Sequence, residues 1–145
     1  MIGRLIYNIL NTDVELSRII KVNSKNQIYP VVIPQTRGYT TSPQNAILYK
    51  ITSQEPVISK DGYEGLLDIG FEVQILGKEY GTVQDMNILS FNALHNQTKQ
   101  SLTGSPSVQS IIMTDSSEEE WEEETEMYSI TQYYIARVYD INNEL

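Results

Sequence analysis

Residues 65–77, GLLDIGFEVQILG, carry the clearest pattern in this sequence and decide the fold that we expect. Apolar residues alternate with polar or small ones through the centre of the stretch. Successive side chains of a β-strand point to opposite faces, so the alternation predicts a strand with one buried side. The expected buried face consists of Ile69, Phe71, Val73 and Ile75, and the opposite face of Asp68, Gly70, Glu72 and Gln74.

Further elements are predicted on both sides of this strand. Residues 45–57 also alternate, and Asp61-Gly62 is a turn signal, so the two strands should form a hairpin. From residue 78 to residue 98 the apolar spacing becomes helical, and two more strands are predicted over residues 107–114 and 127–141. The expected helix buries Val83, Met86, Phe91, Ala93 and Leu94.

The N-terminal third predicts a short helical pair and an edge strand. Apolar residues recur at helical spacing over residues 2–10, and Asp13 can cap a second helix. Pro30 and Pro34 lack backbone donors, which restricts Val31–Ile33 to an edge strand or an extended connection. The second helix is expected to bury Val14, Leu16, Ile19 and Ile20.

Together these elements predict an α+β fold in a single domain over residues 1–145. We expect a two-layer sandwich, in which an antiparallel and possibly mixed sheet of about four main strands carries helices on one face. The last strand has apolar or aromatic side chains on both faces, so we expect it to be covered on both sides, partly by another chain. One face holds Tyr128, Ile130, Tyr134 and Val138, and the other Tyr133, Ile135 and Tyr139.

The residue types argue against an enzyme. There is no cysteine, and no Ser-nucleophile, phosphate-loop, dinucleotide or zinc-protease motif occurs. His95 is the only histidine, and general-base catalysis needs an oriented partner, so we assign it a structural or surface role. We therefore predict no catalytic residues, no cofactor and no metal site.

One acidic stretch dominates the charge. Residues 115–126, DSSEEEWEEETE, hold eight of the nineteen acidic residues, none of the ten basic ones, and the only tryptophan. A nearly neutral body with one negative patch argues against specific nucleic-acid binding and against docking on anionic membrane. Contiguous carboxylates also lack the spacing of a selective metal site, and no transmembrane helix is expected. We interpret the stretch as the loop of a β-hairpin, with Trp121 packed against the sheet or a neighbouring subunit.

The order of segments resembles that of the tail terminator, or tail completion, family of long-tailed bacteriophages. The likeness begins in LIYNILNTDVELSRII (5–20), continues in QIYPVVIPQ (27–35), and extends through the strand–turn–strand–helix segment from Asn45 to Met86. It ends in the final strand, from Tyr128 through Gln132 and Tyr133 to Ile135. The long Glu-rich loop departs from the family pattern.

This resemblance implies a structural virion protein at the head–tail junction. Such proteins form a ring, usually of six copies, that caps the tail tube, stops its polymerisation and meets the head connector. DNA passes through without specific binding. The implied partners are further copies of the chain, the major tail tube protein and the connector or stopper protein. Another connector, neck or head-completion adaptor protein is the alternative.

Two groups of residues are candidates for these contacts. Subunit or partner contacts are expected at Arg37, Tyr39, Trp121, Tyr133 and Tyr139. The acidic loop either faces the lumen and repels DNA or docks a basic ring of tube or connector subunits. Its candidate residues are Glu118, Glu119, Glu120, Glu122, Glu123 and Glu124.

Replacing Glu118–Glu120 and Glu122–Glu124 by glutamine separates the two roles of the loop. If the loop docks a basic partner, joining of heads to tails should fail, because the attraction is lost. Joining can be scored by electron microscopy and DNA delivery by infection or transfer kinetics. Normal joining with slowed delivery contradicts the docking role.

Overall fold

The computed structural model describes residues 2–31, 44–95, 97–98 and 108–139. Its helices are α1 (Ile2–Thr12), α2 (Val14–Ile20) and α3 (Tyr80–Leu94). A two-stranded ribbon follows α2, formed by β1 (Lys21–Val22) and β2 (Lys25–Asn26). The main sheet contains β3 (Ile28–Pro30), β4 (Asn45–Ser59), β5 (Gly62–Gly77), β6 (Gln97–Thr98), β7 (Val108–Ser116), β8 (Glu120–Glu122) and β9 (Met127–Tyr139).

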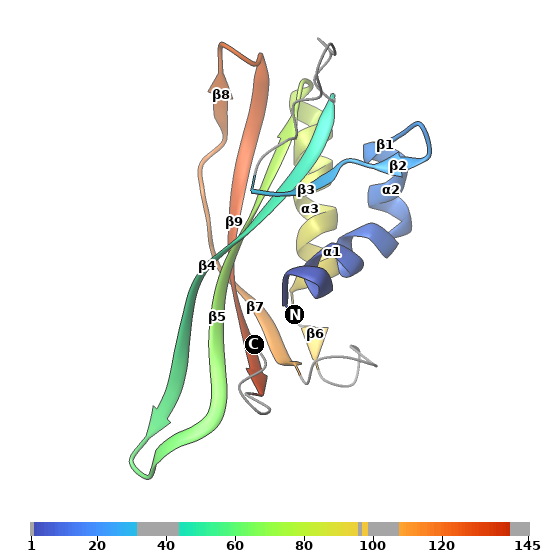
Figure 1. Cartoon of the computed structure of the whole chain (residues 1–145). Coiled ribbons are helices and arrows are strands. Elements are labelled where there is room, and N and C mark those ends of the chain that lie inside the picture. The colour runs from blue at the N-terminus through green and yellow to red at the C-terminus, as the bar shows by residue number, and fades with distance from the viewer. Residues whose placement is uncertain (1, 32–43, 96, 99–107, 140–145) are drawn as a thin grey trace.

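The strand order of the main sheet is β3-β4-β5-β9-β7-β6, and β8 pairs with β9 beyond the end of β7. All pairs are antiparallel except β3–β4, so the sheet is mixed. The helices lie together on one face of the sheet (Figure 1). This arrangement confirms the predicted α+β sandwich, with four long strands and shorter ones at the margins. None of the helices in the described ranges is long and apolar enough to cross a membrane.

The alternating stretch forms the centre of the core, as predicted. β5 pairs along its length with β4 on one side and β9 on the other. Its inward side chains Ile69, Phe71, Val73 and Ile75 are at most 2% exposed. Phe71 stacks on Tyr134 of β9 with 5.1 Å between ring centroids. Each such buried side chain contributes about 1.5–3 kcal/mol from removal of apolar surface from water.

The helices cover this face with short apolar stripes. α1 buries Ile2, Ile6 and Leu10, one residue per turn. Asp13 caps α2, because its carboxylate accepts the backbone N–H of Leu16 at 2.9 Å. The expected burial of Val14 was wrong: it is 64% exposed, since the first residue after the cap points away from the sheet. In α3 the predicted residues Val83, Met86, Ala93 and Leu94 are buried, whereas Phe91 is only half-buried.

The described edge strand is β3 (Ile28–Pro30), which lies directly before the predicted segment Val31–Ile33 and runs parallel to β4. Pro30 is tolerated because nothing in the described sheet pairs with the outer side of β3. Val31 follows the strand, and residues 32 and 33 lie outside the described residues.

β4 and β5 extend beyond the helices as a long hairpin (Figure 1). Asp61 lies in its turn, as predicted, and Gly62 adopts φ +100°, a conformation that favours glycine. Residues 52–56 are exposed, and the register shifts between Ile51 and Ser53 and again between Pro56 and Ile58. None of the described helices packs on the end of this arm (Figure 1).

A buried polar chain links α3 to β9. The Tyr134 hydroxyl donates to Oε1 of Gln132 at 2.6 Å, and Nε2 of Gln132 donates to the carbonyl oxygen and Oδ1 of Asn87, each at 2.8 Å. Gln132 is 0% exposed and Tyr134 is 1% exposed. Burial raises the pKa of Tyr134, so the hydroxyl stays protonated and can donate.

Tyr134→Phe should lower the free energy of unfolding by about 1–2 kcal/mol, because the buried Oε1 of Gln132 loses its donor. Denaturant unfolding followed by circular dichroism measures this. Tyr133→Phe is the matched control on the neighbouring residue, whose ring lies on the exposed face of the sheet. Equal effects of the two substitutions would contradict the assigned network.

Candidate interaction surfaces

The sheet face opposite the helices is uncovered by the described part of the chain. We call it the open face. Its centre is apolar: Ile112, Tyr133 and Ile135 are 46%, 37% and 40% exposed. Cross-strand register places Gly70, Ile135 and Ile112 in one row, so the two isoleucines lie side by side next to a residue without a side chain. An exposed apolar cluster of this kind marks a contact surface.

Two ion pairs flank the open face. Arg137 binds both carboxylate oxygens of Asp68, at 2.8 and 3.0 Å, and the Nζ of Lys50 lies 3.3 Å from Oε1 of Glu72. The hydrogen bond to Asp68 raises the pKa of Arg137. Partly exposed pairs add little stability, but here they place paired charges beside the apolar centre, as in the polar rim of an interface.

The acidic stretch is more ordered than a simple loop. Asp115 and Ser116 belong to β7, Glu120–Glu122 form β8, and residues 123–126 make the turn into β9. Ser117 connects the two strands: its N–H donates to the carbonyl of Thr131 at 2.7 Å and its Oγ accepts the Thr131 N–H at 2.9 Å. The predicted loop 115–126 is therefore an extension of the β7–β9 hairpin, which we call the acidic hairpin.

Trp121 is the end of a row of aromatic rings. It contacts Tyr128 at 4.6 Å between centroids, and Tyr128 meets Tyr80 of α3 edge-on at 5.5 Å. Because Tyr80 belongs to α3, the row lies on the helix-covered side of the sheet. A hydrogen bond to Glu119 raises the pKa of Tyr80, and Gln84 donates to Glu119 at 3.4 Å. The start of α3 thus holds the acidic hairpin in place.

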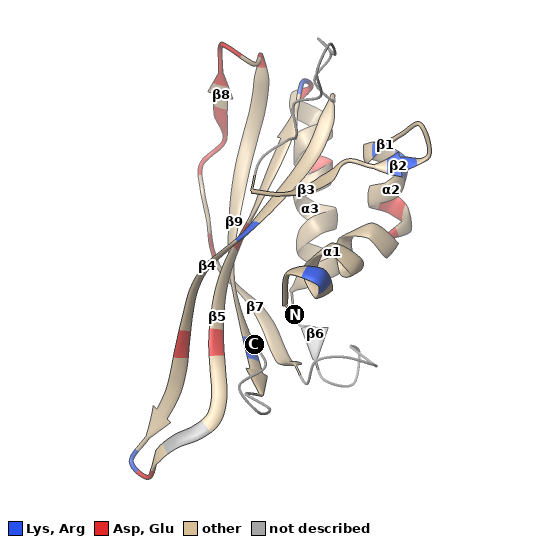
Figure 2. Cartoon of the chain, viewed as in Figure 1, with Lys and Arg blue, Asp and Glu red and all other residues tan. Residues whose placement is uncertain are grey.

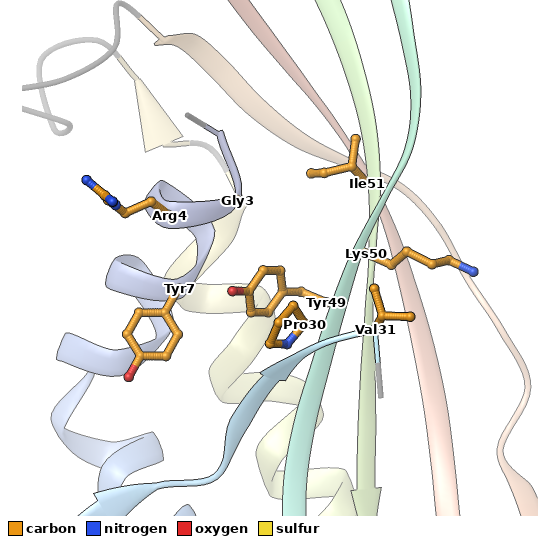
Figure 3. A pocket seen from close by; sticks show the side chains of 8 residues that line it. All are labelled: Gly3, Arg4, Tyr7, Pro30, Val31, Tyr49, Lys50 and Ile51. Atoms are coloured by element: carbon orange, nitrogen blue, oxygen red, sulfur yellow. The ribbon is translucent and has the colours of Figure 1, made fainter. Parts of the chain in front are cut away.

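A pocket of about 590 Å³ lies between α1 and the β3–β4 edge. The ring of Tyr49 points from β4 toward Tyr7 of α1, while Lys50 points away to the other side of the strand (Figure 3). Burial raises the pKa of Tyr49, and the neighbouring Tyr7 adds to this. The pocket is lined by Gly3, Arg4, Tyr7, Pro30, Val31, Tyr49, Lys50 and Ile51.

One residue of this pocket has an unusual backbone. Val31 adopts φ +66°, which β-branched residues rarely take, and its N–H donates to the carbonyl of Tyr49 at 2.9 Å. Strained residues of this kind concentrate at binding and switching sites. The conformation ends the parallel pairing of β3 with β4 at this pocket.

The candidate contact residues named from the sequence differ in their exposure in the structure. Trp121 and Tyr133 are exposed, whereas Tyr139 is half-buried and its hydroxyl accepts from Nε2 of Gln109 at 2.9 Å. Arg37 and Tyr39 lie outside the described residues. All six candidate glutamates are exposed and gather at one end of the sheet, at β8 (Figure 2). The sequence did not indicate the pocket or Ile112.

Two features with possible chemistry have structural explanations. Nδ1 of His95 accepts the backbone N–H of Met113 at 3.0 Å, and the ring stacks on Phe91 at 4.6 Å. His95 therefore ties the end of α3 to β7, in the structural role that was expected. Within the described residues, no group of three or more histidines, aspartates or glutamates has the arrangement of a metal site.

No protein-family model and no curated protein sequence matches this chain. The fold does have a counterpart among solved structures. It is similar to a chain of the structure titled "Virion of native gene transfer agent (GTA) particle", with a TM-score of 0.64. The match covers 92% of this chain and 91% of that chain, at 14% sequence identity. The two chains therefore share a fold over nearly their whole length.

Val31→Gly should leave the free energy of unfolding unchanged or raise it by up to about 1 kcal/mol, because glycine removes the strain of the left-handed conformation. Little burial is lost, since Val31 is 61% exposed. Val22→Gly in β1 is the matched control, at 45% exposure, and should be destabilising. Denaturant unfolding measures both variants. A clear loss of stability in Val31→Gly would contradict backbone strain at Val31.

Proposed function

We propose that this protein is a structural component of a phage-like virion, in which a ring of copies ends the tail tube and joins it to the head. The observation that carries the proposal is the fold shared over 92% of the chain with a protein of a gene transfer agent virion. The resemblance of the segment order to tail terminators supports the position within the particle.

The surfaces of the chain support an assembled role. The open face exposes Ile112, Tyr133 and Ile135 beside paired charges, which suits a protein contact. The acidic hairpin would repel DNA at short range, and a protein that lets DNA pass needs no phosphate-binding surface. The role requires no chemical step, so it uses none of the features that an enzyme needs.

Assembly in vitro tests the position in the particle. The purified protein is added to tail tube subunits of the same particle during polymerisation, and the products are examined by electron microscopy. A tail terminator should form a ring on one tube end and limit tube growth. A ring that binds the head connector and never a tube end contradicts this role and favours a neck or head-completion protein.

Ile135→Lys should reduce the number of capped tubes roughly tenfold or more, because it places an unpaired ammonium group within the apolar centre of the open face. Ile88→Lys on α3 is the matched control, since Ile88 is 57% exposed on the helix side. Circular dichroism should show both variants folded. Normal capping by Ile135→Lys contradicts a role for the open face in assembly.

A further inference from the structure

Trp121 is supported on one side and bare on the other. Its indole contacts Tyr128, yet 48% of the residue is exposed. Tyr128 in turn contacts Tyr80, so the ring is held in a defined position. Large aromatic residues that are rigidly held and half-exposed are typical anchors of protein contacts, because they bury much apolar area at little entropic cost.

The pocket beside α1 is suited to such an anchor. Pro30, Val31 and Ile51 and the rings of Tyr7 and Tyr49 give it mostly apolar walls, and its volume of about 590 Å³ falls within the range of ligand pockets. Ile51 is 41% exposed, although it lies on the same face of the sheet as the core. The pocket therefore has apolar surface that an inserted side chain would remove from water.

Charge complementarity also favours the insertion of Trp121 into this pocket. Arg4 is exposed at the rim of the pocket and forms no ion pair with a described residue. The surrounding segment, residues 2–31, has four basic and two acidic residues, whereas residues 115–126 have eight acidic and no basic ones. Glu123 lies in the turn that follows β8, two residues from Trp121. An inserted Trp121 brings the acidic hairpin, this carboxylate included, toward the basic segment that contains Arg4.

The anchor and the pocket lie at opposite edges of one sheet. Between β8 and β4 lie β9 and β5, so the two strands are three spacings apart, about 14 Å. Register places Trp121 in the row of Asn45, five positions before Lys50, which adds about 16 Å along the strands. Since the acidic hairpin is also held by β9 and α3, a copy cannot fill its own pocket.

We propose that Trp121 of one copy inserts into the pocket between α1 and β3–β4 of the next copy. The contact joins two different surfaces, so an open row of copies keeps one free anchor at one end and one free pocket at the other until a ring closes. The inference rests on the ring of the proposed function and names the contact that builds it.

Site-specific crosslinking tests the contact. Because the sequence contains no cysteine, only the introduced thiols can react. One tagged copy carries Glu123→Cys and a second, untagged copy carries Arg4→Cys, which leaves Trp121 in place. With a short bismaleimide, crosslinked dimers of one tagged and one untagged chain should form only in the mixture. Ile88→Cys in place of Arg4→Cys is the control and should give no crosslinked dimer.

Two substitutions, one in the anchor and one in the pocket, test how strongly the contact stabilises the ring. Trp121→Ala and Ile51→Glu should each raise the concentration needed for ring formation roughly thirtyfold, as for a central interface residue. Native mass spectrometry measures the rings, and circular dichroism reports that the variants fold. Both residues are at least 41% exposed in the single chain, so neither change should disturb the core.

The outcomes separate this contact from the proposed function. Rings that form without the crosslink and tolerate Trp121→Ala overturn the contact and leave the function standing. A wild-type chain that stays monomeric at high concentration also overturns it. Crosslinked rings that neither cap tubes nor limit their growth support the contact and contradict the function.

Discussion

The one-sided burial of β5 is the constraint on which the rest of the structure depends. Its alternating side chains place Ile69, Phe71, Val73 and Ile75 in the core, and its pairing with β4 and β9 extends that core across the sheet. The described helices α1, α2 and α3 cover only this face and only part of its length (Figure 1). The open face, the projecting β4–β5 arm and the pocket beside α1 are the surfaces that this incomplete cover leaves exposed.

Polar interactions then fix the position of α3 relative to the sheet. The chain of hydrogen bonds from Tyr134 through Gln132 to Asn87 ties α3 to β9, and His95 ties the end of α3 to β7. The start of α3 also holds Tyr80 against Tyr128, and Tyr128 supports Trp121. The same helix that completes the core therefore positions the exposed tryptophan, which makes the fold and the proposed contact parts of one arrangement.

The sequence predicted the features that depend on local pattern. Alternation identified the buried face of β5, and Asp61-Gly62 marked its turn, because both signals lie within a few residues. The strand β8 was missed because Glu-rich segments favour loops, and only the ladder with Met127–Ser129 makes it a strand. The burial of Gln132 could not be predicted from local pattern, since its partner Asn87 lies 45 residues away in the sequence. The pocket combines residues near positions 5, 30 and 50, and no local pattern brings these together.

The central claim is that surfaces left bare in the single chain are covered by other copies, and Trp121 reports on it directly as the only tryptophan. The most direct measurement is its emission spectrum across a dilution series, with the assembly state followed in parallel by mass photometry. The account predicts blue-shifted emission in the assembled ring and a red shift at the dilution at which the ring dissociates. An emission maximum that is unchanged while the ring dissociates would show that Trp121 stays in water and would contradict the account.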